Sequence, residues 1–293
     1  SKIRLVVPKG TKKAYKSAPN WERFFKKPRT VAEQCPDEYA IIPVPNRIAY
    51  HSGKTLSTKS LGKIIAPASL ANEQERLKEV LSHRLGIKNF NKGKRPITLG
   101  IDNKIGGKEA YRLVIDEKGI SITGADATGV FYGIMTLDQM LVPEQEGGRL
   151  AYLNAVTVED RPRTGMRERM ADPCRVVIPF EDLKGMVVEM ARYKMNALHL
   201  HLTDDQAWRI EIKKYPRLTE LGSFRVGMDD MQMPIGGFYT QEQMKELVAF
   251  ASQYHVEMFP EIEMPGHQVA AIHCYPELTC GAVQLPIRTT CGV

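Results

Sequence analysis

The chain has 293 residues, of which 43% are hydrophobic and 26% charged, the composition of an ordinary globular protein able to bury a large core in one or two domains. No apolar run approaches the ~18–20 residues that a membrane-spanning helix requires, so no membrane span is expected. The net charge of +7 belongs to residues 1–30, which hold ten Lys or Arg and one acid, whereas the other 263 residues sum to −2.

A basic arm is therefore predicted over residues 1–38. Such an arm can touch nucleic acid or a membrane surface, but a solvated leader is the favoured interpretation, and we expect no nucleic-acid partner. The chain begins with Ser1 rather than Met and shows no signal peptide, so its N-terminus is interpreted as processed or engineered.

Residues 39–158 are predicted to form an α+β domain. Two stretches with apolar residues at helical spacing alternate with short apolar strands and a hairpin. In chain order the predicted elements are a strand at Ala40–Val44, a helix at Leu70–Leu85, a strand at Ile97–Ile101, a hairpin at residues 111–122 and a helix at Thr128–Leu141. Strands mixed with two helices are typical of this fold class, and nothing in the domain is predicted to be catalytic.

In residues 159–293 the order of predicted elements differs, because strands and helices alternate along the chain. The predicted elements are strands at Met166–Asp172, Asn196–Thr203 and Val256–Ile262, a helix at Phe180–Lys194 and a helix that opens at Thr240. This alternation implies parallel strands with right-handed crossovers. The predicted fold is an α/β (β/α)8 barrel of the TIM type, and about half of it is expected here because a complete barrel needs roughly 250 residues.

The stretch from Leu198 to Arg209 carries the strongest functional signal. It begins as a strand in which leucines alternate with two histidines and a threonine, and it runs directly into the adjacent carboxylates Asp204 and Asp205. A polar strand that ends in paired acids is how an α/β barrel presents catalytic groups at its C-terminal rim. Two simpler interpretations stay open: the acids form an N-cap or turn, or the histidines are hydrogen-bonded core residues.

All three predicted strands of this region offer polar residues near their ends. The candidates are Arg167, Arg169 and Asp172 on the first strand, residues 199–205 on the second, and Glu261, Glu263 and His267 on the third. Parallel strands in register bring such groups to one rim. We therefore predict that Arg167, Asp204 and His267 cluster at the carboxyl ends of the strands.

Several separated motifs between Arg161 and Cys280 occur together in one order. They are Arg167; Asp172 and Arg175; Lys194-Met195-Asn196 leading into His199-Leu200-His201-Leu202-Thr203-Asp204-Asp205-Gln206; Trp208-Arg209; Tyr215-Pro216; Gly237-Phe238-Tyr239-Thr240; and Pro260-Glu261-Ile262-Glu263-Met264-Pro265-Gly266-His267. Together they resemble glycoside hydrolase family 20, the β-N-acetylhexosaminidases. Residues 40–158 also resemble the α+β domain that precedes the barrel in that family.

The resemblance implies a retaining exo-glycosidase that removes terminal β-linked N-acetylglucosamine or N-acetylgalactosamine. The 2-acetamido oxygen of the substrate acts as the nucleophile, so catalysis is substrate-assisted. The resemblance implies that Asp204 and His267 form a catalytic relay that supports the general acid, and that Arg167 binds sugar hydroxyls with its planar donor fork. The implied substrate-binding residues are Arg167, Asp205, His199 and Glu261. No metal and no other cofactor is implied.

Two departures from the family pattern stand out. Glu263 occupies a position where the family usually has Asp, and the family's His-x-Gly-Gly-Asp-Glu motif does not occur between Ser1 and Val293. That motif supplies the acetamido-orienting aspartate and the acid. We therefore expect this chain to be the N-terminal part of a hexosaminidase and to be inactive alone.

Two other functions remain open. A metal-dependent barrel hydrolase would use His199, His201, Asp204, Glu261 and His267 as ligands, because nitrogen and oxygen donors of this kind suit a catalytic zinc. A non-catalytic sugar-binding or structural remnant of the enzyme is the second alternative.

Partners and location follow from the resemblance. The expected partner is a glycan with a terminal β-N-acetylhexosamine, and either a second copy of the chain or a completing segment is expected to cover the half barrel. A secreted or periplasmic location is expected. The five cysteines show no C-x-x-C pair, so the redox compartment is undecided, and a loop disulfide among Cys274, Cys280 and Cys291 is left open.

Overall fold

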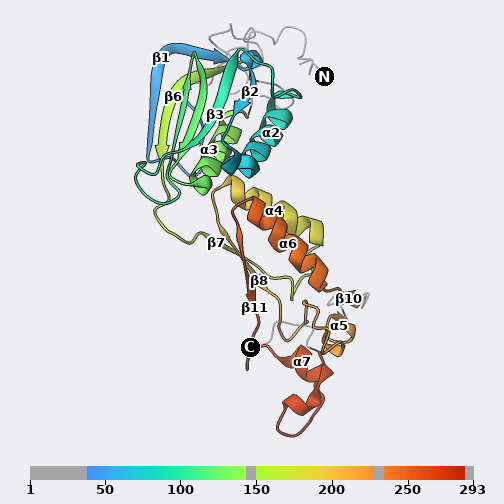
Figure 1. The fold of residues 1–293 in the computed structure, drawn as a ribbon. Coiled ribbons are helices and arrows are strands. Elements are labelled where there is room, and N and C mark those ends of the chain that lie inside the picture. Colours follow the sequence, from blue (N-terminus) through green and yellow to red (C-terminus); the bar gives the residue numbers. More distant parts are fainter. Residues whose placement is uncertain (1–37, 143–149, 227–233, 288–293) are drawn as a thin grey trace, which may run out of the picture.

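The computed structural model describes residues 38–142, 150–226 and 234–287. Figure 1 shows an elongated molecule, with an α+β unit at one end and a smaller unit of alternating strands and helices at the other. The predicted basic arm lies outside the described residues except for Glu38, which is exposed. Among the described residues, no helix combines the length and the apolar character needed to cross a membrane.

The α+β unit is a six-stranded sheet with two helices on one face. Its strands lie in the order β1-β6-β4-β5-β3-β2, with β2, β3 and β5 parallel and the other pairs antiparallel. The bounds are β1 Arg47–Ser57, β2 Leu61–Ile65, α2 Ala71–Leu85, β3 Arg95–Ile101, β4 Tyr111–Asp116, β5 Gly119–Gly124, α3 Ala127–Met140 and β6 Tyr152–Asp160, with short 3-10 helices η3 Thr58–Ser60 and η4 Ala68–Leu70. Helix α3 is buried on nearly all sides because it packs on the sheet, on α2 and on α4 (Phe180–Arg192) of the second unit.

The sequence-based prediction of this unit was correct for the two helices, the hairpin and the strand at β3. The strand predicted at Ala40–Val44 is wrong, because this segment forms no strand; its prolines, Pro43 and Pro45, lack the amide hydrogen that a ladder needs. Strands β1, β2 and β6 were not predicted. Most of β1 is exposed, so it shows no apolar alternation, whereas the buried positions of β6 do carry an apolar pattern.

The second unit is built on three parallel strands in the order β11-β8-β7. Its main elements are β7 Glu168–Ala171, α4 Phe180–Arg192, β8 Ala197–His201, α6 Gln241–Gln253 and β11 Glu257–Glu261; the smaller ones are α5 Arg217–Glu220, β9 Phe224–Val226, β10 Pro234–Gly236, α7 Val269–Cys274 and η5 Pro276–Leu278. Thr240 and Gln243 form the predicted capping box at α6. All three predicted strands and both helices are present, and the carboxyl ends of the strands share one edge.

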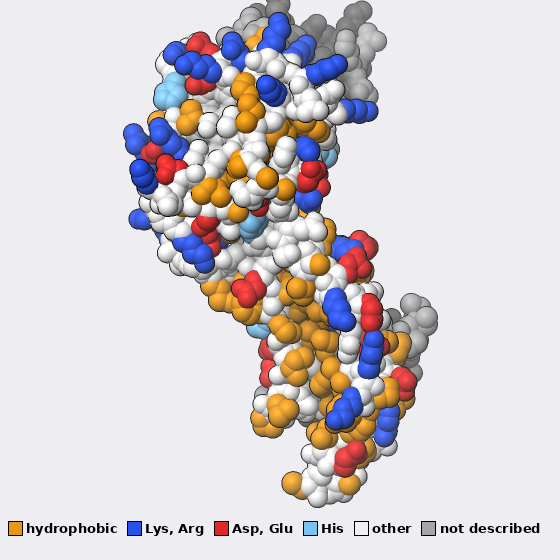
Figure 2. Space-filling view, viewed as in Figure 1, with side chains coloured by type: hydrophobic (Ala, Val, Ile, Leu, Met, Phe, Trp, Pro, Cys, Tyr) orange, Lys and Arg blue, Asp and Glu red, His pale blue; other side chains and the backbone are white. Residues whose placement is uncertain are grey.

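The two faces of this sheet differ in character. Leu198 and Leu200 of β8 are buried in the core cluster to which α4 and α6 also contribute. On the opposite face, Met170 and Phe259 are in register with His199 and both are exposed. Figure 2 shows hydrophobic side chains gathered on this unit, whereas Lys and Arg are spread over the α+β unit. The expected second copy or completing segment would bind at this open face, and that expectation stays a prediction.

A buried lysine joins the two units. The Lys194 ammonium lies 2.9 Å from a carboxylate oxygen of Asp160 and donates to the Tyr111 hydroxyl at the same distance. Burial lowers the pKa of Lys194, and the Asp160 charge opposes that shift. The ion pair therefore links the chain entering β8 to the last strand of the α+β sheet.

Replacing this lysine tests the junction. Lys194→Met is expected to lower the free energy of unfolding by about 3–5 kcal/mol, because the Asp160 carboxylate is left buried without its counter-ion. Urea denaturation measures the change. Lys184→Met is the control, since Lys184 lies on the surface of α4 beside Glu181 and Glu246 and its loss should leave stability nearly unchanged. Equal effects of the two substitutions would contradict the role of Lys194.

The described cysteines, Cys174, Cys274 and Cys280, form no disulfide. Burial raises the pKa of the Cys274 thiol to about 11, and it also raises the pKa of Cys174. Cys291 lies outside the described residues, so a loop disulfide that involves Cys291 stays a prediction.

Candidate active site

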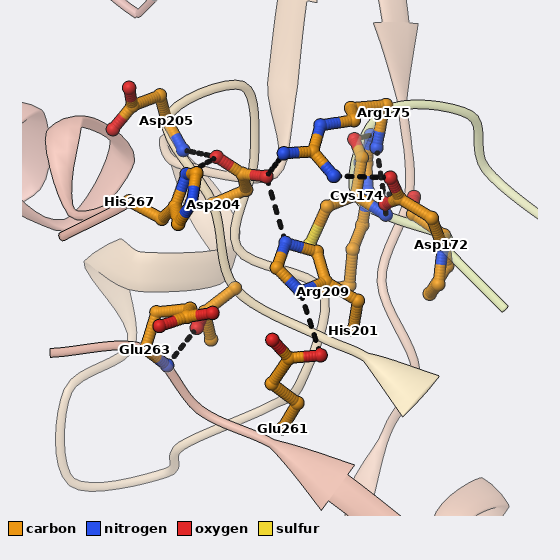
Figure 3. Close-up of polar contacts among 12 residues, drawn as sticks. Asp172, Cys174, Arg175, His201, Asp204, Asp205, Arg209, Glu261, Glu263 and His267 are labelled. Carbon is orange, nitrogen blue, oxygen red and sulfur yellow. Dashed lines mark hydrogen bonds and ion pairs between the residues drawn. The ribbon is translucent and has the colours of Figure 1, made fainter. Parts of the chain in front are cut away.

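A buried carboxylate, Asp204, lies at the centre of the polar groups at the carboxyl edge (Figure 3). Its side chain is 1% exposed. One oxygen accepts from His201 Nε2 at 2.8 Å and lies 2.5 Å from an Arg175 guanidinium nitrogen. The other oxygen lies 2.8 Å from His267 Nδ1 and accepts the backbone N–H of Asp205 at 2.6 Å. Three basic side chains from different segments therefore meet on one acid.

Local backbone structure places Asp204 at that point. Strand β8 ends at His201, and the Leu202 amide still donates to the Glu261 carbonyl, so β8 and β11 stay joined at their ends. A tight turn follows, in which the Asp204 amide donates to the Ala207 carbonyl and Thr203 bridges to Trp208. This turn directs the carboxylate inward, beneath the loops that follow the strands.

The electrostatics keep Asp204 ionised. Burial alone would raise its pKa, but the hydrogen bonds from His201 and from the Asp205 amide, with the charges of Arg175 and His267, bring the pKa below the ordinary value. The carboxylate is thus a fixed negative charge whose oxygens are committed to protein groups. It can orient its partners, but it is not placed to accept a proton from solvent.

His201 lies between two carboxyl groups. Its side chain is 3% exposed, with Nε2 on Asp204 and Nδ1 2.9 Å from an oxygen of Glu261. Burial opposes the charged ring, yet the contacts with Asp204 and Glu261 outweigh it and raise the pKa of His201. The ring therefore holds a proton at higher pH than an ordinary histidine.

A second chain of contacts runs along the open face below His201. His199 lies between Glu168, at 2.9 Å, and Glu261, at 2.7 Å. The hydrogen bond to Glu168 is the main cause that raises the pKa of His199. The contact between the carboxyl groups of Glu261 and Glu263 raises the pKa of Glu263. Burial would raise the pKa of Glu261 as well, but Glu263 and the two histidines favour its charged form and lower its pKa. Of the two acids, Glu263 is therefore the one that takes up a proton at the higher pH.

Arg175 presents its guanidinium at the rim. It contacts Asp172 at 2.6 Å and Asp204 at 2.5 Å, and its side chain remains 31% exposed. The loop that carries it is held from below by Arg209, which is fully buried and donates to the carbonyls of Pro173 and Cys174. The same guanidinium also donates to the carbonyls of Ser223 and Gly237. Burial lowers the pKa of Arg209.

Arg167 is not part of this cluster, which corrects the prediction that it joins Asp204 and His267. It precedes the first residue of β7, whereas the cluster lies beyond the other end, roughly 15 Å away at about 3.3 Å per residue. Its guanidinium donates to the Lys194 carbonyl and the Tyr132 hydroxyl and pairs with Glu109 at 2.8 Å. Arg167 is thus an interdomain residue and does not face the rim.

The structure brings together Asp204 and His267, and it links Glu261 and His199 to them through His201. Asp205 makes a different contact, since one of its oxygens accepts the Val269 amide at the start of α7, and its carboxylate points away from the cluster in Figure 3. Asp205 therefore contacts the start of α7, as the simpler interpretation expects, while a carboxylate oxygen of it also lies within 4.8 Å of donor atoms of Asp204 and His267. The catalytic and sugar-binding roles of the predicted residues stay predictions.

The sequence-based prediction gave no catalytic or sugar-binding role to two members of the cluster, His201 and Arg175. Both could have been found from position along a strand. His201 lies nearer the carboxyl end of β8 than His199, and Arg175 follows the end of β7 whereas Arg167 precedes its start. The rule that active groups lie at carboxyl ends of barrel strands favours the later residue in each case.

Three clusters of described residues have donor atoms within 4.8 Å of one another, close enough for a metal ion. They are Asp172, Cys174 and His201; His201, Glu261 and Glu263; and Asp204, Asp205 and His267. A metal ligand must be a neutral imidazole with a free lone pair, but both nitrogens of His201 face carboxyl groups and its pKa is raised. The two clusters that contain His201 therefore fit a proton-bearing network better than a zinc site.

The raised pKa of His201 predicts a pH dependence. A group whose folded pKa is raised contributes stability that is complete below its unfolded pKa, ~6.5, and that is lost as the pH rises through the folded pKa. The difference in unfolding free energy between the unmodified chain and His201→Asn should therefore shrink from pH 5.5 to pH 9. Urea denaturation across that range measures it, with the exposed His83→Asn as control. A difference that grows with pH would contradict the assignment.

Two family profiles together match nearly the whole described chain. The profile described as glycosyl hydrolase family 20, catalytic domain, matches residues 165–291, and the profile for domain 2 of the same family matches residues 38–161. A β-hexosaminidase of Porphyromonas gingivalis is 40% identical over 264 residues, which cover 86% of this chain and 34% of that protein.

Solved structures give the same result. A mutant β-hexosaminidase of Streptomyces plicatus in complex with product (GlcNAc) superposes with a TM-score of 0.77 at 31% identity, covering 88% of this chain and 53% of that one. An exo-β-N-acetylglucosaminidase of Vibrio harveyi in complex with N-acetylglucosamine gives a TM-score of 0.73 at 31% identity, covering 81% and 38%. The chain thus spans about a third to a half of the length of these relatives.

Proposed function

This chain belongs to glycoside hydrolase family 20, and on that premise we propose that the cluster around Asp204 is part of the active site of a β-N-acetylhexosaminidase. The three parallel strands are then strands of a (β/α)8 barrel, and the cluster lies at the carboxyl edge where barrel enzymes hold their active sites. The observation that carries the proposal is one buried carboxylate holding both Arg175 and His267 at this edge.

The two groups held by Asp204 suit different roles. Arg175 is partly exposed and is fixed by two carboxylates, so its planar guanidinium is presented at the rim, where its proposed role is to bind hydroxyl groups of a terminal sugar. His267 is 45% exposed and uses Nδ1 on Asp204, which leaves Nε2, across the ring, for a carboxyl group of the reaction. Asp204 thus orients a sugar-binding cation and an imidazole at a fixed separation.

The reaction proposed is hydrolysis with retention of configuration. The acetamido oxygen of the substrate attacks the anomeric carbon as the glycosidic bond breaks and the leaving oxygen receives a proton; water then opens the cyclic intermediate. The protein supplies position, charge and the proton. The substrate class proposed is a glycan ending in β-N-acetylhexosamine, supported by the N-acetylglucosamine named for the Streptomyces and Vibrio structures.

A chromogenic assay tests the proposal. The protein at its natural length, and this 293-residue chain beside it, are incubated with 4-nitrophenyl N-acetyl-β-glucosaminide and with the matched β-glucoside that lacks the acetamido group. We expect the protein at its natural length to turn over the first substrate only, because the second has no internal nucleophile, and to give a β-configured first product by NMR. We expect the 293-residue chain to turn over neither substrate, because the motif that supplies the general acid does not occur between Ser1 and Val293. Similar turnover of both substrates would contradict substrate-assisted catalysis, whereas sugar binding without turnover would favour the sugar-binding alternative.

A further inference from the structure

The two ring nitrogens of His201 both face carboxyl oxygens. Nε2 lies 2.8 Å from Asp204 and Nδ1 lies 2.9 Å from Glu261, and almost none of the side chain reaches solvent. A neutral imidazole has one donor and one acceptor, so one of these contacts would set a lone pair against an ionised oxygen. A ring that carries hydrogen on both nitrogens donates a hydrogen bond to Asp204 and forms an ion pair with Glu261, although the Nδ1 contact does not have the geometry of a hydrogen bond.

The groups around the ring are mostly acidic. Those that face His201 are Asp204, Glu261, Glu263, Asp172, Cys174 and the ring of His267, which lies at 5.8 Å in an edge-on orientation; Arg175 and His199 contact these acids from further out. Arg175 offsets part of the negative charge through its ion pairs with Asp172 and Asp204. A positive ring offsets a further part of it between Asp204 and Glu261.

Asp204 depends on this contact for its orientation. Its two oxygens diverge, one toward His267 and the other toward both Arg175 and His201. Arg175 approaches from the loop after β7 and His267 from the segment after β11, and both side chains are partly exposed. Of these three basic partners, His201 alone comes from within a strand and is fully enclosed, so it is the rigid partner.

We propose that His201 is a positioning residue: clamped between Asp204 and Glu261, it fixes the Asp204 carboxylate so that one oxygen stays on His267 and the other on Arg175. In this arrangement the ends of β8 and β11 and the loop after β7 are joined by ion pairs and hydrogen bonds (Figure 3). The consequence for catalysis rests on the proposed function, but the consequence for His267 does not.

Two substitutions separate the two contacts of the ring. Measured from the backbone, the side-chain amide nitrogen of Gln lies about as far out as Nε2 of histidine, and that of Asn lies about as far out as Nδ1. His201→Gln should therefore keep the bond to Asp204, whereas His201→Asn should keep only the contact with Glu261. In the protein at its natural length, we expect His201→Asn to lower kcat by about 10- to 100-fold, as for other orienting partners, and to change KM less. We expect the kcat of His201→Gln to be close to that of the unmodified protein.

A buried histidine elsewhere controls for lost stability. His255 pairs with the buried Glu73 at 2.8 Å at the contact of α2 with the second unit, far from the carboxyl edge. His255→Asn removes a similar ion pair, so it should lower stability without changing kcat. If His255→Asn and His201→Asn reduced kcat equally, or if His201→Gln were no better than His201→Asn, the positioning role would be overturned.

A measurement on this chain gives an answer that does not depend on turnover. Nitrogen-15 NMR of the imidazoles reports whether Nδ1 of His267 carries the hydrogen that it donates to Asp204. We expect that signature in the unmodified chain, in His255→Asn and in His201→Gln, and its loss in His201→Asn. If His201→Asn lost the signature but the unmodified protein at its natural length had no hexosaminidase activity, the positioning role would stand and the proposed function would be rejected. If the signature were unchanged in His201→Asn, the positioning role would be rejected.

Discussion

Asp204→Asn is expected to lower kcat/KM on an N-acetyl-β-glucosaminide by about 10²- to 10⁴-fold, the largest effect of any single substitution in the described part of the chain. The amide keeps the shape of the carboxylate but removes its charge and turns one acceptor into a donor. His267 then loses the partner that sets its tautomer, and Arg175 loses the anion that holds it. Orienting carboxylates and acid–base groups contribute on this scale in other hydrolases.

The same substitution should also destabilise the fold, because it leaves cationic groups against a neutral amide in a site that is 1% exposed. Breaking a buried ion pair on one side costs about 3–5 kcal/mol. Steady-state kinetics and urea denaturation measure the two effects separately. Asp205→Asn is the matched control: it is adjacent in sequence and has the same change in chemistry, but its carboxylate anchors α7. If Asp205→Asn lost as much activity as Asp204→Asn, the assignment of Asp204 would be wrong.

Arg175→Lys is expected to raise KM by roughly 10- to 100-fold, because a hydrogen bond to a charged group contributes about 1.5–3 kcal/mol. Lysine retains the positive charge but not the planar fork, so it cannot contact Asp172, Asp204 and a sugar hydroxyl together. The effect should appear mainly in KM if the contact is made equally in the ground state and the transition state.

Arg167→Lys provides the comparison that distinguishes the two arginines. Arg167 lies at the opposite end of β7 and contacts Glu109 and Tyr132 between the units, so its substitution should lower stability and leave KM unchanged. Inhibition constants for N-acetylglucosamine, measured for both variants, check the result without depending on turnover rate. A larger rise in KM for Arg167→Lys than for Arg175→Lys would restore the original prediction that Arg167 binds the sugar.

Position along a strand accounts for this difference between prediction and structure. The strand at 166–172 was predicted correctly, and both arginines belong to the motifs that resemble the family, but polarity alone did not say which of them reaches the rim. Arg167 is polar because it joins two units through Glu109 and the Lys194 carbonyl. Such a contact involves residues 27 to 58 positions away, and no local pattern records it.

The sequence by itself determined the alternation of strands and helices, the capping box at Thr240, and the face of β8 that carries the histidines. These features depend on residues within one or two turns or strand steps, where spacing alone sets the geometry. It also determined the family, because the motif from His199 to Asp205 and the motif around His267 are individually unusual.

Only the tertiary structure decided which polar residues act together. Position along β8 favours His201 over His199, but spacing could not show that His201 contacts Asp204, nor that Asp205 accepts the amide of Val269 at the start of α7. Burial and pairing set those assignments, since an ionised group out of water must find its counter-charges among whatever segments the fold brings near. For Asp204 these come from the loop after β7, from β8 and from the segment after β11, and the most distant of them, His267, is 63 residues away from Asp204 in the chain.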